Sequence, residues 1–349
     1  MRQKWAILGV VLLSFGAVSQ PHNEPFEKLS QYGFFKGELK NLDPSGNVIA
    51  YELNTPLFTD YAYKARFMHI PAGKATMESN FKLSFPVGTT LIKNFYYPED
   101  FRKETGKRRI LETRLLIHKP EGWEALTYVW NAEQTDAELE YAGDELEIKW
   151  THHDGKERTA SYVVPNKNQC KGCHETSKKV VPIGPTARNL NRKNKYFGKE
   201  VNQLEYLHST GQLDLGAASI ASVPVFPVWD DAKNWSINDR ARAWLDVNCA
   251  HCHNPAGPAN TSGLDLAFDQ NDPGKIGICK VPIAAGRGSG GLHFDILPGK
   301  PEHSILHYRL ITNDPGVMMP ELGRTMIHEE GVKLVAEWIS GMTEPDCKK

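Results

Sequence analysis

The sequence predicts an α+β multidomain protein, in which an N-terminal antiparallel β domain, sandwich-like or barrel-like, is followed by two small, mainly α-helical units. Three observations support this fold class. Turn-forming residues interrupt residues 31–165 at short intervals, and the runs between them are rich in β-branched and aromatic residues. Beyond residue 165 this alternation stops, and helix-type patterns follow. The length of 349 residues allows roughly two to three domains.

The β-rich domain is predicted to span residues 31–165. Its expected strands are residues 89–97, 109–118, 123–130, 146–152 and 159–164. Clusters of Pro, Gly, Asn and Asp lie between these runs and favour tight turns. Short strands joined by such turns are typical of antiparallel sandwiches and barrels.

The two helical units are predicted at residues 166–235 and 236–349. The first contains one expected helix, near residues 199–209. In the second, Ser236 or Asn238 could cap a helix that runs to Asn248. A short helix is expected near residues 301–310. A last helix, near residues 328–340, places its apolar residues on one face.

The charge balance and the N-terminus limit the possible partners and location. Lys plus Arg number 41 and Asp plus Glu number 42, so the chain has no net positive charge. We therefore do not expect it to bind nucleic acid. Residues 1–19 resemble a signal peptide, with basic Arg2 and Lys4, an apolar stretch, and the small residues Ala17 and Ser19 before an expected cleavage after Ser19. Residues 20–30 would then be a linker. We therefore expect a periplasmic or extracellular protein without a stable membrane span after processing.

Two C-x-x-C-H motifs carry the main chemical signal. Cys170, Cys173 and His174 form the first, and Cys249, Cys252 and His253 form the second. This spacing attaches haem c, because two thiols three residues apart reach both vinyl groups and the adjacent His reaches the iron. We therefore expect two covalently attached haem c groups, with both units being cytochrome c-type haem domains. A Cys₄ zinc site, redox-active cysteine pairs and ordinary disulfides are the alternatives, but none explains the repeated His.

The second axial ligand of each iron is less strongly indicated. For the second haem the candidate is Met319, in a Pro-containing loop before the last helix. Met318, His293, His303 and His307 are alternatives. For the first haem the nearest downstream candidate is His208. The β domain offers further candidates, and an open iron is also possible: Met68, His69, His118, His152 and His153.

The remaining cysteines and a basic segment suggest two further features. Cys279 and Cys347 are left over, so an exported chain is expected to pair them in a disulfide. Residues 166–199 are strongly basic. A basic surface beside a haem could attract an acidic redox partner, or it could balance charges inside the protein. The basic residues are Lys167, Lys171, Lys178, Lys179, Arg188, Arg192, Lys193, Lys195 and Lys199.

With both motifs in view, the C-terminal unit resembles a class I cytochrome c domain. The whole chain resembles a family of bacterial exported dihaem c-type cytochromes. The matching segments are residues 54–61, 168–174, 246–253 and 284–291. The resemblance implies that His174 and His253 are the proximal iron ligands. The first unit departs from class I because no Met occurs between His174 and Met318.

The function predicted from the sequence is the relay of single electrons between redox partners through the two haems. One alternative is a dihaem enzyme, such as a peroxidase, with an open first haem. Another is a binding module in which the β domain recognises a ligand and the haems are accessory. A fold alone does not decide between these functions, so the choice depends on the chemistry of the site.

Overall fold

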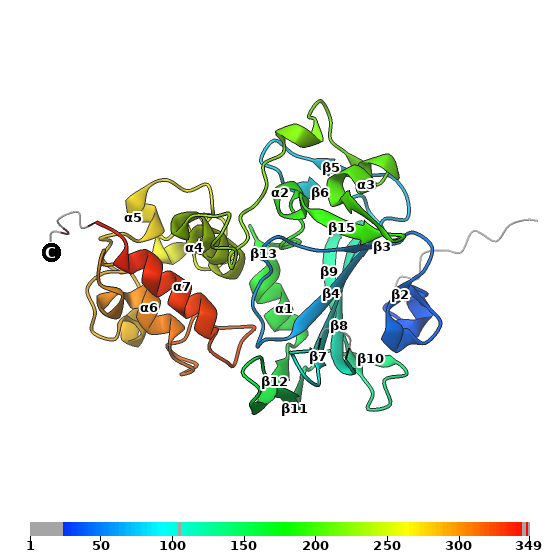
Figure 1. The fold of residues 1–349 in the computed structure, drawn as a ribbon, viewed down its shortest axis with the longest axis horizontal. Coiled ribbons are helices and arrows are strands. Elements are labelled where there is room, and N and C mark those ends of the chain that lie inside the picture. Colours follow the sequence, from blue (N-terminus) through cyan, green and yellow to red (C-terminus); the bar gives the residue numbers. More distant parts are fainter. Residues whose placement is uncertain (1–23, 104–105, 344–346, 348–349) are drawn as a thin grey trace, which may run out of the picture.

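The computed structural model describes residues 24–103, 106–343 and 347, and shows a β-rich molecule (Figure 1). The predicted signal peptide, residues 1–19, lies outside these residues, as does the start of the predicted linker. Across the described ranges, no helix is both long and apolar enough to cross a membrane.

A six-stranded antiparallel sheet forms the centre of the molecule, with strand order β10-β9-β8-β7-β4-β3. Side chains alternate between its faces. Ile92 of β7 is buried on one face with Leu29 and Phe34, whereas Leu91 and Phe95 pack on the other face. The strands are β3 (Val48–Tyr51), β4 (Tyr63–His69), β7 (Thr90–Pro98), β8 (Arg108–Lys119), β9 (Gly122–Trp130) and β10 (Ala137–Glu140).

Smaller elements cover the central sheet. The hairpin of β11 (Asp144–Thr151) and β12 (Glu157–Val164) packs Trp150 and Tyr162 against Phe95. The N-terminal part adds η1 (Leu29–Tyr32), β1 (Phe35–Lys36), η2 (Leu39–Asn41) and β2 (Asp43–Pro44).

Residues 166–235 do not form a separate helical domain. Their helices are short: α1 (Lys167–His174), α2 (Ala187–Leu190), α3 (Gln203–Ser209) and the turn η3 (Ile220–Ser222). They alternate with β13 (Glu175–Thr176), β14 (Lys179–Val180), β15 (Lys193–Tyr196), β16 (Lys199–Asn202) and β17 (Leu213–Asp214). Strand β17 pairs with β5 (Ala75–Met77), which also pairs with β6 (Leu83–Ser84). This segment therefore completes a sheet of the N-terminal part.

The hydrophobic core explains why residues 166–235 pack as one body with the N-terminal part. Leu190 of α2 and Leu204 of α3 are fully buried, and they share one apolar cluster with Met68 of β4 and Leu91 of β7. The cluster draws residues from both sides of the predicted boundary at residue 165, so neither side has this core to itself.

Residues 236–343 contain helices connected by long irregular segments. The elements are α4 (Ile237–Leu245), the π-helical turn η4 (Asp246–Ala250), η5 (Asn260–Ser262), α5 (Pro273–Ile276), η6 (Gly286–Ser289), η7 (Pro301–His303), α6 (Ile305–Leu310) and α7 (Glu329–Ser340). Helices α4 and α7 pack closely because Gly331 has no side chain; a Cβ there would lie 2.6 Å from Trp244 ring atoms.

The predicted fold class is therefore wrong. The described residues hold seven short α-helices and several antiparallel sheets, rather than two mainly helical haem domains beside a β domain. The expected helix near residues 199–209 is confined to α3, and the expected helix near 301–310 is split between η7 and α6. The sequence thus located these helices approximately, but it did not reveal the short strands β15, β16 and β17 around α3.

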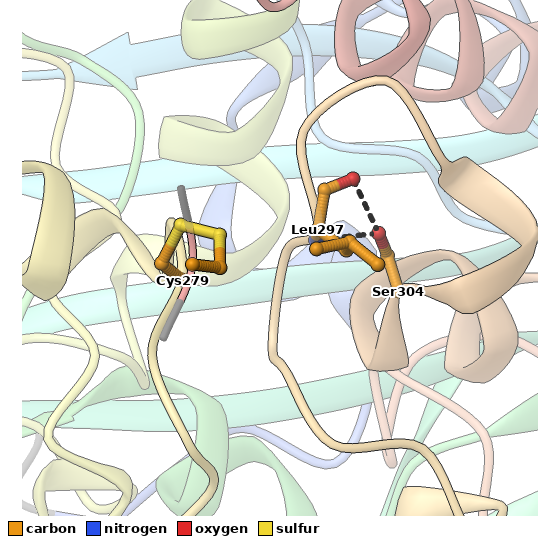
Figure 2. Close-up of a disulfide and its surroundings, with 4 residues drawn as sticks. Cys279, Leu297 and Ser304 are labelled. Carbon is orange, nitrogen blue, oxygen red and sulfur yellow. Dashed lines mark hydrogen bonds between the residues drawn. A yellow bond between two sulfur atoms is a disulfide. The ribbon is translucent and has the colours of Figure 1, made fainter. Parts of the chain in front are cut away.

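The structure joins Cys279 and Cys347 in a disulfide, with their Cα atoms 5.1 Å apart (Figure 2). Nearby, the Leu297 N–H donates to Ser304 Oγ at 2.9 Å (Figure 2). The disulfide thus ties the C-terminal end to the irregular segment after α5, as the sequence predicts.

Candidate functional site

The first C-x-x-C-H motif forms helix α1, which contacts β9 of the central sheet (Figure 1). The helix begins after Asn166, whose side chain accepts a hydrogen bond from Gln169 N. It ends at His174. The Nδ1–H of His174 donates to Val181 O at 2.8 Å, which leaves Nε2 as the unprotonated nitrogen. Burial lowers the pKa of His174 to about 3, so the imidazole is neutral at physiological pH.

The second motif follows α4 in the π-helical turn η4 and the residues after it. Here Ser262 Oγ donates to Ala259 O at 2.7 Å. The same oxygen accepts from His253 Nδ1–H at 3.0 Å, so Nε2 of His253 is again the free nitrogen. Burial lowers its pKa to about 4. Both motif histidines therefore present the same atom, in the same protonation state, to a ligand.

Each motif lines a cavity of its own. The cavity of the first motif measures about 470 Å³ and is lined by Cys170, Cys173 and His174. The cavity of the second measures about 360 Å³ and is lined by Cys249, Cys252 and His253. We call them cavity 1 and cavity 2. Most of the surface that lines each of them is apolar, with Leu91 and Phe95 in cavity 1 and Leu266 and Ile305 in cavity 2.

The two cavities share a wall. The residues that line both are Cys173, Asn248, His251, Leu310, Met319, Pro320, Glu321 and Leu322. Motif residues contribute from both sides, since Cys173 belongs to the first motif and His251 lies inside the second. Groups bound in the two cavities would therefore be neighbours.

Cavity 1 contains a row of cations on the central sheet. Arg66 of β4, Lys93 of β7 and Arg114 of β8 pair directly across the strands and line the cavity together. Like charges opposite one another destabilise a sheet. Two of them have acidic partners: Arg66 Nη1 lies 3.3 Å from Glu52 Oε2, and the guanidinium of Arg114 binds Glu112 through two hydrogen bonds.

Lys93, in the middle of this row, has no acidic partner among the residues that the structure describes. Burial, followed by repulsion from Arg114 and Arg66, lowers its pKa to about 7. Lys64 lines the same cavity, and burial also lowers its pKa. Such a wall suits a ligand that brings negative charge.

The motif cysteines are four free thiols in the structure. Burial raises the pKa of Cys249 to about 12 and that of Cys252 to about 11, and it also raises the pKa values of Cys170 and Cys173. They are therefore protonated thiols and not reactive thiolates. In the described part of the chain, no three His, Cys, Asp or Glu side chains converge on a metal-sized site, so the two pairs do not form a Cys₄ centre.

Only some of the candidate axial ligands line a cavity. Met319 lines both cavities and Met318 lines only cavity 1. The other candidates for the second haem, His293, His303 and His307, are absent from the lining of cavity 2.

His208 does not lie at either cavity. It is exposed on α3, and its Nδ1 is 3.0 Å from Leu213 O. This position argues against a ligand role for His208. The β-domain candidates are also outside the lining of cavity 1: Met68, His69, His118, His152 and His153.

The segment of residues 54–61, noted for its resemblance, connects the sheet to the second motif and to the Met319 loop. The Phe58 N–H donates to Asn248 Oδ1 at 2.9 Å, beside Cys249. The buried carboxylate of Asp60 accepts from Thr325 N at 2.7 Å and from Met326 N at 2.8 Å. These bonds hold the shared wall against the β-rich part.

Sequence reasoning missed His251 and the cation row. His251 lies between Cys249 and Cys252 in the second motif, so the motif itself drew attention away from it. The cations alternate with apolar residues along strands, as Lys64 and Arg66 do on β4. This period-2 pattern of charges inside buried strands was the available signal.

No protein-family model, no curated protein and no solved structure matches this chain. The function is therefore inferred from the chemistry of the two cavities.

Proposed function

We propose that this chain is a dihaem c-type cytochrome, exported from the cell, that relays single electrons between redox partners through two covalently attached haems. The proposal includes its place in the family of bacterial exported dihaem cytochromes that its motifs resemble. It rests on one observation above the others. Each C-x-x-C-H motif lines a cavity with both thiols and with a neutral histidine whose Nε2 is free.

The residues around both cavities fit haem. Haem is a flat apolar ring with two carboxylate side chains, and the cavities are mainly apolar. In cavity 1, Lys93 and its cationic neighbours are placed to receive carboxylates. The four motif cysteines form no disulfide and are protonated thiols. Cysteines are in this state before their thiols add to the vinyl groups of haem.

Bound haem would supply a one-electron couple at its iron. Cys170 and Cys173 would hold the first group, and Cys249 and Cys252 the second, through thioether bonds. His174 and His253 would each offer Nε2, because their Nδ1–H groups are held by Val181 and Ser262. A thioether from Met319 would raise the potential of the second iron relative to a second imidazole. The shared wall would keep the two groups adjacent, which is what electron exchange within one chain requires.

A count of covalent haem in the mature protein, expressed with a cytochrome c maturation system, tests the proposal. Mass spectrometry and the pyridine haemochrome spectrum should give two haems per chain. The Cys170→Ala/Cys173→Ala variant and the Cys249→Ala/Cys252→Ala variant should each lose one. The matched control, Cys279→Ser/Cys347→Ser, also removes two cysteines and should keep both haems. A chain without covalent haem, or one in which both motif variants keep two haems, would refute the proposal.

The partner is proposed to be a redox protein, and an acidic one. Exposed lysines follow the first motif on the hairpins β13–β14 and β15–β16: Lys178 in the turn before β14, Lys179 on β14, and Lys193 and Lys195 on β15. Charge reversal of these four should flatten the salt dependence of haem reduction by an acidic donor protein. The control reverses four exposed lysines elsewhere: Lys36, Lys40, Lys74 and Lys82. Equal salt dependence in both variants would mean that the basic segment does not dock the partner.

A further inference from the structure

His251 is the unexpected residue of the shared wall. It lies between Cys249 and Cys252 in the second motif, where His253 already offers a nitrogen to the second iron. Yet the side chain of His251 also lines cavity 1, which belongs to the first motif. A residue whose backbone belongs to one haem site thus contributes to the cavity of the other.

The imidazole of His251 has a poorly satisfied nitrogen. Its Nδ1 is fully buried and makes no hydrogen bond of regular geometry within the described residues, and only a weaker contact to the backbone of Val247 joins the imidazole. Among the histidine nitrogens of the described residues, it alone is buried without a regular hydrogen bond. Since the Val247 contact lacks hydrogen-bond geometry, the imidazole has no well-formed partner within the described residues, and a partner is to be sought in the cavity.

The other side chains of cavity 1 that could bind iron have another explanation, and Met319 is already assigned to the second haem. His328 Nδ1 accepts from Trp244 Nε1–H at 3.0 Å, so its Nε2 carries the proton, and its ring stacks on Phe58 at 4.2 Å between centroids. Lys64 Nζ donates to Ala62 O at 3.1 Å. Met318 is buried, but a thioether needs no hydrogen bond, so packing alone explains it. Of the three histidines that line cavity 1, His251 is therefore the one that still lacks a role.

We propose that His251, in addition to His174, would supply a ligand to the iron of a haem held in cavity 1. This inference rests on the proposed function, because it needs a haem in cavity 1. It makes the first iron bis-histidine, whereas the second takes His253 and Met319. Imidazole in place of a thioether lowers the reduction potential, so the first haem should be the lower-potential centre and should pass its electron to the second.

The inference has a consequence for the path between the centres. His251 and His253 are separated by Cys252 alone. The ligand of the first iron, a thioether of the second haem and the ligand of the second iron would then belong to three consecutive residues.

The wild-type protein with both haems gives the first test. Electron paramagnetic resonance and near-infrared magnetic circular dichroism of the oxidised protein should show two low-spin centres in equal amounts, one bis-imidazole and one imidazole–thioether. Two imidazole–thioether centres, or a high-spin centre, would overturn the inference. This reading needs no variant, so a folding failure cannot obscure it.

The second test uses His251→Gly, which leaves space for added imidazole. One of the two low-spin signals, about half of the haem, should become high-spin, and imidazole in solution should restore it. His208→Gly is the matched control, because that histidine lies outside both cavities, and it should change neither signal. Met318→Leu should also leave both signals intact. If His251→Gly keeps both signals without imidazole, or if Met318→Leu loses one, the assignment fails.

The haem count separates this failure from failure of the proposed function. A protein with two covalent haems in which His251 is not a ligand would leave the electron-transfer proposal standing. A protein without covalent haem would remove both.

Discussion

Lys93 offers a quantitative test of how cavity 1 is occupied. It lies between Arg66 and Arg114 in the cross-strand row, without an acidic partner among the described residues. The perturbation is Lys93→Met, which keeps most of the side-chain volume and removes the charge. If cavity 1 holds the carboxylates of haem, the substitution removes an ion pair. If it does not, the substitution only removes the cost of burying the charge and its repulsion by Arg114 and Arg66.

The magnitude follows from the pKa of Lys93, which burial and the two arginines lower from 10.5 to about 7. Each pKa unit is worth about 1.4 kcal/mol, so the charged lysine costs at most about 5 kcal/mol of folding free energy without an anion. The pKa of this base is lower in the folded state than in the unfolded state. The cost is therefore fully present below about pH 7 and disappears as the pH rises to 10.5. At pH 9 about 2 kcal/mol should remain.

The assay is guanidinium unfolding of four proteins: the parent, Lys93→Met, Cys170→Ala/Cys173→Ala, and the combination. In the background without the first haem, Lys93→Met should stabilise the fold by up to about 5 kcal/mol at pH 6 and by about 2 kcal/mol at pH 9. With both haems bound, the gain should be smaller by about 2 kcal/mol or more, because a charge-assisted hydrogen bond is lost. Lys36→Met, at an exposed lysine, is the control. Equal gains in both backgrounds would refute the placement of haem carboxylates on this row.

Three further predictions concern the second cavity and its supports. Met319→Leu should keep both haems attached, lower the potential of the second, and remove its near-infrared thioether band; an unchanged spectrum would exclude Met319 as ligand. Asp60→Ala should lower the free energy of unfolding by about 1–3 kcal/mol, because the backbone N–H groups of Thr325 and Met326 lose their acceptor. Glu78→Ala, at an exposed carboxylate, should have little effect in the same guanidinium titration. Cys279→Ser/Cys347→Ser should cost about 4 kcal/mol in the loop-entropy account, given the separation of 68 residues, and a thermal midpoint equal to that of the parent would contradict this.

The sequence was most informative where chemistry depends on neighbours along the chain. The spacing of Cys170, Cys173 and His174 indicated an attachment site, and the structure places all three on one cavity. The pairing of Cys279 with Cys347 could be inferred by elimination, because the other four cysteines already had a role. The helix near residues 328–340 followed from apolar periodicity and is present as α7.

The fold was less predictable, because two-residue strands such as β13 and β17 carry almost no periodic signal. Their pairing depends on long-range partners, as β17 depends on β5. The same limit applies to the site. His208 is near the first motif in sequence but outside its cavity, whereas His251 is distant in sequence and lines it. Distance along the chain was a poor guide to which residues meet at cavity 1.

The wall that both cavities share also bears on how such a protein can change over evolutionary time. Many electron carriers are modular, and a one-haem module can be gained, lost or exchanged with its cofactor site intact. Here a cut between residues 235 and 236 would remove His251 and the Met319 loop from cavity 1, and would remove Cys173 from cavity 2. Neither half would keep a closed site. If the two cavities hold haem as proposed, the two sites must be inherited together, and a substitution in their common wall affects both.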